Sequence, residues 1–252
     1  MYLRTPGLVL RISDYNEHDA LLTLLTPEYG RLVAKARGLR RKNSPLTAPC
    51  QLLAWGDYTL FEYNGYYTVN EAFSIELFRG LRSDIVKLSL GTYFAQVAAL
   101  VSQSDLPNKE LLSLILNCLY ALSSLNEPEI KVKAVFELRC ACIAGYTPDL
   151  SGCHVCGCER PDRFDVSAGV LECRPCRDPG SDGLRMPLAL GVLEAMRYIS
   201  VCDPKRIFSF DAERSTMECL SQITETYLTT QLERGFSTLD FYKSLLLPFP
   251  SQ

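Results

Sequence analysis

Residues 30–55 read GRLVAKARGLRRKNSPLTAPCQLLAW and contain no Asp or Glu. Apolar and polar residues alternate in the first part, so that Leu32, Ala34 and Ala36 take one face of a predicted strand and the cations take the other. Gly38 ends this strand, and a loop follows that closes at Pro45. The cationic residues of the strand and loop are Arg31, Lys35, Arg37, Arg40, Arg41 and Lys42.

This concentration of positive charge is suited to a polyanion backbone such as nucleic acid. We therefore predict that these six cations bind DNA. If each of them neutralises one phosphate of a single strand, the logarithm of the binding constant falls with the logarithm of salt at a slope of about −4. The alternative is a solvated edge strand, whose Lys and Arg side chains only prevent aggregation.

The composition is that of a globular protein, because nearly half of the 252 residues are hydrophobic. We expect no secretory leader and no membrane span, because the apolar run at residues 8–10 stops at Arg11 and the run at residues 111–125 is short and interrupted. The sequence therefore predicts a cytoplasmic protein. In that reducing compartment, eleven cysteines indicate a metal site or buried thiols and not a disulfide framework. The net charge of −3 is an average that a local basic patch can override.

The region before residue 79 is strand-like throughout. Short alternating runs, separated by turns and too close together for crossover helices, predict a five-stranded closed barrel of the OB-fold type. Asn64-Gly65 between Tyr63 and Tyr66 is the strongest hairpin signal. Six aromatic residues of this hairpin either stack on bases or pack within the barrel: Tyr58, Phe61, Tyr63, Tyr66, Tyr67 and Phe73.

After Arg79 the apolar residues recur three and four apart, which is typical of helices. We expect a helix capped by Ser83, a second capped by Asn108, and a third that opens at Pro128 and stops at Gly145. Further helices are expected at residues 187–201, 211–234 and 239–246. Together they predict a helical bundle.

Two C-x2-C pairs interrupt the helical region, with the spacing C-x2-C-x16-C-x2-C. This is a structural zinc spacing, and we predict one zinc ion per chain, held by Cys153, Cys156, Cys173 and Cys176. His154 and Cys158 are rival ligands. Because the surrounding Pro and Gly residues leave little core, we expect the module to be loose without metal.

Catalytic motifs are absent from the sequence. It has no Walker A motif, no G-x-G-x-x-G and no H-E-x-x-H, and its two histidines are His18 and His154. A zinc ion held by four thiolates leaves no position for water. We expect neither enzyme activity nor a bound nucleotide. Asp14, Glu17 and Asp19 are either a metal-binding set or a solvated turn.

Several segments follow one another in a specific order. Residues 7–11 are GLVLR, Ala36-Arg37-Gly38 is followed by Arg40 and Ser44, and residues 136–139 are FELR, ahead of Gly145-Tyr146 and the first cysteine pair. In this order they resemble the RecO family of bacterial recombination mediators, whose A-K-G-x-R-x-x-S segment has Lys in place of Arg. Ala168-Gly169 departs from the family's common Gly pair, and Cys158 is an extra thiol.

The resemblance implies an OB-fold domain, a helical domain and an inserted zinc module, which we place at residues 1–79, at 80–148 with 186–252, and at 149–185. It implies binding of single- and double-stranded DNA, annealing without ATP, and loading of the RecA recombinase together with RecR onto DNA coated with single-strand-binding protein. The family's helical domain accepts that protein's acidic, Phe-ended tail. Candidate cations for this tail are Arg139, Arg82 and Lys87. The alternative function is a protein-interaction adaptor with only incidental DNA contact.

Overall fold

The structure is a computed structural model that describes residues 1–177 and 183–247. The chain divides into two compact units. The first comprises Met1–Asn126 and the segment from Phe236 onward, and the second comprises Glu127–Gly235. Each unit has its own core and is described by itself.

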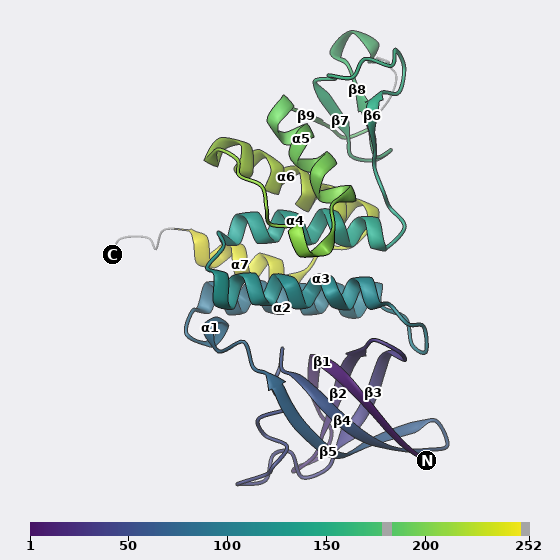
Figure 1. Cartoon of the computed structure of the whole chain (residues 1–252), viewed down its shortest axis with the longest axis vertical. Helices are drawn as coiled ribbons and strands as arrows, with labels where there is room; N and C mark the ends of the chain where they lie inside the picture. The colour runs from purple at the N-terminus through teal and green to yellow at the C-terminus, as the bar shows by residue number, and fades with distance from the viewer. Residues whose placement is uncertain (178–182, 248–252) are drawn as a thin grey trace. The chain divides into compact units, whose positions relative to one another are not determined.

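Five strands of the first unit close into a barrel with the order β1-β2-β3-β5-β4 (Figure 1). Their bounds are β1 (Tyr2–Asp14), β2 (Ala20–Thr26), β3 (Gly30–Ala36), β4 (Trp55–Tyr63) and β5 (Tyr66–Glu76). The predicted five-stranded OB-fold barrel is therefore confirmed. Because β3 pairs with β2 on one side and with β5 on the other, it is not an edge strand, and that alternative was wrong.

The hairpin between β4 and β5 forms where the sequence predicts it. Tyr63 lies opposite Tyr66, and the two residues between them, Asn64 and Gly65, have φ values of 50° and 78°. Two consecutive positive φ angles give the turn that matches the twist of a hairpin. The strand before this turn begins at Trp55, and the apolar residues just ahead of it belong to the loop between β3 and β4.

The barrel core contains the apolar face of β3. Leu32, Ala34 and Ala36 are buried in one core cluster with residues of other strands, including Leu22 of β2 and Leu60 of β4. The opposite face of β3 carries the half-buried Arg31 and Lys35. The predicted two-faced strand is thus confirmed, with one face in the core and the other cationic.

Helices complete the first unit, and two of them contact the barrel strands β1 and β2 (Figure 1). The bounds are α1 (Arg79–Arg82), α2 (Ile85–Val101), α3 (Lys109–Tyr120), the π-helical turn η1 (Ala121–Leu125) and α7 (Ser237–Leu246). Asn108 caps α3 as predicted, since its side chain accepts from the Leu111 N–H. Ser83 does not cap α2. Its hydroxyl donates to the Gly80 carbonyl, and Asp84 accepts from the first turn of α2 instead.

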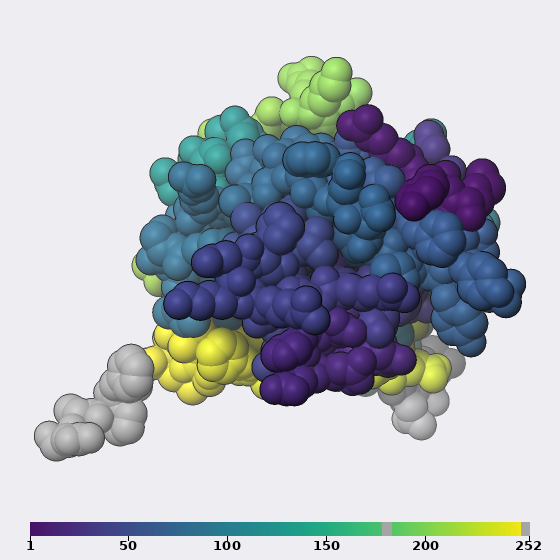
Figure 2. All heavy atoms as spheres, turned by 90° about the horizontal axis from the view of Figure 1, so that it is seen from below, coloured from purple at the N-terminus to yellow at the C-terminus, as the bar shows by residue number. Residues whose placement is uncertain are grey.

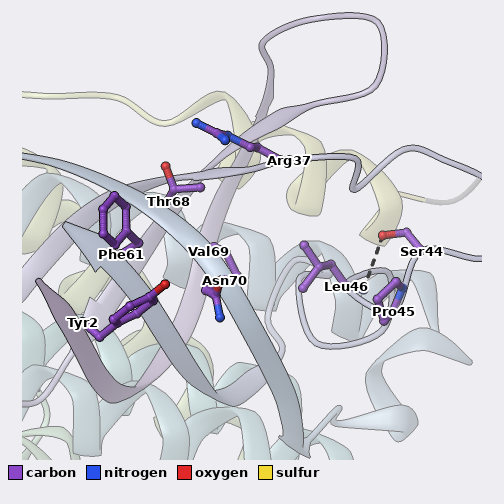
Figure 3. A pocket seen from close by; sticks show the side chains of 9 residues that line it. All are labelled: Tyr2, Arg37, Ser44, Pro45, Leu46, Phe61, Thr68, Val69 and Asn70. Carbon is purple, nitrogen blue, oxygen red and sulfur yellow. Dashed lines mark hydrogen bonds between the residues drawn. The ribbon is translucent and has the colours of Figure 1, made fainter. Parts of the chain in front are cut away.

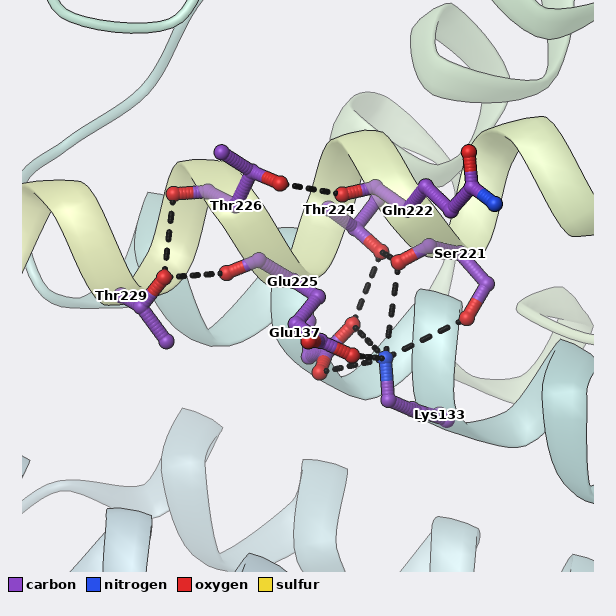
Figure 4. Close-up of polar contacts among 8 residues, drawn as sticks. All are labelled: Lys133, Glu137, Ser221, Gln222, Thr224, Glu225, Thr226 and Thr229. Carbon is purple, nitrogen blue, oxygen red and sulfur yellow. Dashed lines mark hydrogen bonds and ion pairs between the residues drawn. The ribbon is translucent and has the colours of Figure 1, made fainter. Parts of the chain in front are cut away.

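The second unit contains three longer helices and a small sheet. The helices are α4 (Glu129–Ile143), α5 (Leu190–Val201) and α6 (Arg214–Gln231), with a short 3-10 turn, η3 (Pro204–Arg206). α4 and α6 pack together around a buried polar cluster, shown in Figure 4, in which the Lys133 ammonium lies 3.0 Å from Glu137 and 2.8 Å from Glu225. Thr224 donates to the same Glu137 carboxylate at 2.9 Å. Each charged group of the cluster thus has an opposite charge or a hydrogen-bond partner, as a buried charge requires.

The four-stranded sheet has the order β6-β8-β7-β9. Its bounds are β6 (Asp149–Cys153), β7 (Arg163–Asp165), β8 (Val170–Glu172) and β9 (Arg185–Pro187), and the 3-10 turn η2 (Arg174–Cys176) follows β8. Phe164 and Leu171 are fully buried, and the buried Arg185 pairs with both Asp165 and Glu172. Phe164 packs against Tyr227 of α6, with ring centroids 5.3 Å apart, so the buried face of the sheet uses a helix outside the module. The expectation that this module has little core of its own stays a prediction.

The compact units do not follow the predicted domain boundaries. α7 belongs to the unit that contains the barrel, whereas α4, α5 and α6 belong to the other. The boundaries predicted at residues 79, 148 and 185 stay a prediction. Among residues 1–177 and 183–247, no helix is both long and apolar enough to cross a membrane.

Candidate nucleic-acid interface and metal site

The loop after β3 carries three cations that point into solvent. The side chains of Arg37, Arg41 and Lys42 are exposed. They form no ion pair or hydrogen bond with any of the residues that the structure describes. In the view of Figure 2, the dark-blue segment between β3 and β4 crosses the middle of the barrel's face. These three cations are therefore free to meet an anionic ligand.

Arg31 takes a different position from the other predicted DNA-binding residues. Its guanidinium donates to the Ala99 carbonyl at 2.6 Å, near the end of α2. The last carbonyls of a helix lack partners within the helix and favour a cation there. Arg31 is thus engaged in holding α2 against the barrel.

Lys35 and Arg40 are paired with carboxylates of the β1–β2 turn. Lys35 lies 3.0 Å from Asp19, and Arg40 lies 3.0 Å from Asp14. Asp19 also accepts from the Gly38 N–H at 2.8 Å, and this bond together with Lys35 lowers the pKa of Asp19 to about 2. The two carboxylates therefore anchor the start of the basic loop.

A pocket of about 450 Å³ opens beside one of the free cations, Arg37, and it lies wholly within the barrel and its loop. Figure 3 shows the rings of Tyr2 and Phe61 on one side and residues 44–46 on the other, with Arg37 at the upper edge. The volume lies in the range of about 300–1,000 Å³ that is usual for small-ligand sites. The full lining is Tyr2, Arg37, Ser44, Pro45, Leu46, Phe61, Thr68, Val69 and Asn70.

The aromatic residues of the hairpin divide into two groups. Tyr58 is fully buried, and its hydroxyl donates to the Pro49 carbonyl at 2.6 Å, so it belongs to the core. Tyr67 is half-buried. The remaining four are exposed and available to a ligand: Phe61, Tyr63, Tyr66 and Phe73.

The pattern of the sequence missed five pocket residues: Tyr2, Leu46, Thr68, Val69 and Asn70. Tyr2 lies at the start of β1 and far from the hairpin in sequence, but barrel closure pairs it with Phe61. The signal that could have revealed it is the β1–β4 register, which is a property of the closed barrel and not of either strand alone.

The four predicted metal ligands come together in the second unit. The sulfur atoms of Cys153, Cys156, Cys173 and Cys176 all lie within 4.8 Å of one another. The Cys156 and Cys173 sulfurs are 3.9 Å apart. Tetrahedral ligands about 2.3 Å from a zinc ion would be separated by about 3.8 Å. The donor set therefore fits a tetrahedral, thiolate-bound metal ion.

Backbone groups around one of these thiols, that of Cys153, favour the thiolate form that binds metals. Burial raises the pKa of Cys153, but the N–H groups of Cys156, Val155 and Cys173 outweigh this effect and lower it to about 6. Burial raises the pKa of Cys173, and hydrogen bonding with Cys156 raises that of Cys176. Of the rival ligands, His154 uses Nδ1 in a 3.0 Å hydrogen bond with the Leu171 carbonyl. Cys158 is outside the cluster of four.

The three predicted tail-binding cations all have partners. Arg139 donates to the carbonyls of Ile199, Ser200 and Cys202 at the end of α5. Arg82 donates to the Leu52 carbonyl, and Lys87 to the Asn126 side chain. Arg82 and Lys87 belong to the first unit, and Arg139 belongs to the second.

Comparison with known proteins agrees with this arrangement of a barrel, helices and a cysteine cluster. Residues 1–78 match the family model described as "Recombination protein O N terminal", and residues 82–240 match "Recombination protein O C terminal". The chain belongs to the RecO family. The resemblance noted in the sequence is thereby confirmed, and with it a place among DNA repair proteins.

Curated RecO relatives match along most of their length. The "DNA repair protein RecO" of Acetivibrio thermocellus is 32% identical, with 97% of each chain covered. That of Alkaliphilus metalliredigens is 28% identical over 97% of this chain and 100% of its own. That of Listeria innocua is 29% identical over 88% of this chain and 86% of its own.

Proposed function

We propose that this RecO protein binds single- and double-stranded DNA through the basic loop of its barrel and anneals complementary strands without ATP. The observation that carries the proposal is the group of three exposed cations without partners in the described structure, Arg37, Arg41 and Lys42. They lie on a loop whose start is fixed by Asp14 and Asp19. A fixed loop presents its charges to a phosphate backbone without first having to be ordered.

Annealing follows from charge neutralisation and involves no chemical step. When cations cover the phosphates of two strands, the strands repel each other less, and their bases can pair. We propose that the protein works in this way as a non-enzymatic mediator, helping to load RecA together with RecR onto DNA coated with single-strand-binding protein. Membership of a DNA repair family supports this role, and it implies a cytoplasmic protein associated with the nucleoid.

We propose zinc as the metal of the cysteine cluster. The set of four thiols within 4.8 Å of one another fits zinc, and four thiolates would close its coordination. Such an ion would join the turn after β6 to the turn after β8. The four cysteines would then hold these two turns together through the ion, which would stabilise the fold without taking part in a reaction.

The tail of single-strand-binding protein would need an apolar slot beside a cation. An apolar groove of about 250 Å³ runs between α2 and α7 and is lined by Leu88 and Phe241 among others. Lys87 lies in the same turn of α2 and uses one of its three donors on the Asn126 side chain, whereas the guanidinium of Arg139 is shared by three carbonyls. We therefore favour Lys87 as the cation for this tail.

The test is the annealing of complementary oligonucleotides in the absence of nucleotide. Removing the loop cations in the triple variant Arg37→Ala, Arg41→Ala, Lys42→Ala should slow annealing at least tenfold, because each phosphate contact contributes to affinity. The matched control is Arg160→Ala, Lys205→Ala, Arg234→Ala, which removes the same charge from exposed positions of the second unit. If the loop variant and the control variant annealed oligonucleotides at the same rate, the result would favour the adaptor function.

A further inference from the structure

Two uncharged aromatic rings form one side of the pocket beside the basic loop. Tyr2 is 63% exposed and Phe61 is 39% exposed, and their centroids are 5.3 Å apart with the planes tilted by 56°. The barrel core is filled by other residues, so neither ring is needed there. A pair of exposed rings at the mouth of a pocket is a surface on which a flat ligand can stack.

The polar residues Thr68 and Asn70 line the same pocket (Figure 3). Asn70 is exposed, and β5 bulges at this residue, since Val69 pairs with Leu60 and Glu71 pairs with Thr59. It is therefore the extra residue of the strand pair. Its amide has both donors and an acceptor, and Thr68 adds a hydroxyl to the lining. Such groups match the edge of a nucleobase.

Arg37 connects this pocket to the proposed phosphate site. It lines the pocket and is one of the three free cations of the loop. A nucleotide whose phosphate meets Arg37 would have its base within reach of the two rings. The pocket thus combines a cation, a stacking surface and polar groups, which together suit one nucleotide of a flexible strand.

We propose that this pocket takes one unstacked nucleobase of single-stranded DNA, which stacks on Tyr2 or Phe61 while its phosphate pairs with Arg37. The inference rests on the proposed DNA-binding function and adds what the loop cations alone do not provide, a contact with the base. A base within a duplex would have to leave its stack to enter the pocket. The pocket therefore favours single strands over duplexes.

The test compares two single-stranded oligonucleotides with the same number of phosphates. One is oligo-dT, and in the other every base is replaced by an abasic tetrahydrofuran. The wild-type protein should bind oligo-dT roughly 5- to 150-fold more tightly, the range expected for one base stacked on an aromatic ring. The slope of affinity against salt should be equal for the two, since their phosphate contacts are the same. This comparison needs no variant.

A pair of variants then assigns the effect to the pocket. Tyr2→Leu, Phe61→Leu should abolish the preference for oligo-dT and leave the salt slope unchanged, because neither ring is charged. Tyr66→Leu is the control, since Tyr66 is 79% exposed on the same hairpin and does not line the pocket. It should keep the full preference. Thermal unfolding of each variant verifies that the barrel remains folded.

The outcomes separate this inference from the proposed function. Equal affinity of the wild type for both oligonucleotides, with the salt slope retained, would overturn the base pocket and leave DNA binding standing. Loss of the preference in Tyr66→Leu but not in the double variant would place the base elsewhere on the hairpin and overturn the assignment. No binding to either oligonucleotide would refute the proposed function, and the base pocket with it.

Discussion

At the scale of single residues, the basic stretch separates into cations with different tasks. Arg31 holds a helix end, Lys35 and Arg40 hold the loop through two carboxylates, and the remaining three face solvent. The sequence showed which side chains are cationic, but their partners come from the tertiary structure. The register that pairs Ala20 with Ala36 brings the β1–β2 turn beside the end of β3.

Asp19 gives a prediction about pH. Its usual pKa of about 3.9 is lowered to about 2 by the Gly38 N–H and by Lys35. The folded state therefore gains stability from this carboxylate at pH values above about 4, and loses it as the pH falls toward 2. Carbon-13 NMR titration of the carboxyl should give a midpoint near 2. In Lys35→Met the midpoint should rise but stay below 3.9, because the Gly38 N–H still donates. A wild-type midpoint near 4 would mean that Asp19 does not anchor the loop.

At the scale of elements, alternation and turn signals predicted the barrel strands well, and the apolar run before Trp55 is the exception. Leu53 has a φ of 64°, and its N–H donates to the carbonyl of Val9 in the neighbouring β1, so this run is a loop held against β1 and not a strand. Similarly, the predicted helix at residues 187–201 begins only at Leu190 because residues 185–187 pair with β7. Both differences depend on contacts distant in sequence, which local patterns do not contain.

Gly30, the first residue of β3, gives a prediction at this scale. Its φ is 60°, and a Cβ there would lie 2.2 Å from the Leu106 carbonyl oxygen. Gly30→Ala should therefore destabilise the protein by more than about 2 kcal/mol, the upper cost of the backbone strain alone. Gly65→Ala is the control, because it has a positive φ with nothing within 4 Å. It should cost only the strain, about 1–2 kcal/mol. If urea unfolding gave the same loss in free energy of unfolding for Gly30→Ala and Gly65→Ala, the contact with Leu106 would be absent.

At the scale of the whole molecule, the proposed DNA site and the proposed metal site lie in different compact units. The basic loop is in the first unit and the cysteine cluster is in the second. The order of motifs along the chain was enough to predict the family, the barrel and the four thiols. It was not enough to predict the ion pairs of Arg185 with Asp165 and Glu172, because they form only when β8 and β9 lie on either side of β7.

Removing the metal should therefore have a local effect. With a chelator, or in Cys173→Ser, we expect faster hydrogen exchange around residues 153–158 and 173–176, while Phe164 and Leu171 keep their part of the sheet closed. Affinity for single-stranded DNA should change less than threefold. Loss of all DNA binding after mild chelation would instead place the primary DNA site in the cysteine module.

The most direct test of the central claim is the salt dependence of single-stranded DNA binding, measured for the wild type and for Arg37→Ala, Arg41→Ala, Lys42→Ala. If the three loop cations each neutralise one phosphate, the triple variant should have a slope of log affinity against log salt that is flatter by about 2. The control variant Arg160→Ala, Lys205→Ala, Arg234→Ala should keep the wild-type slope. An unchanged slope in the loop variant would contradict the claim that DNA lies along the basic loop of the barrel.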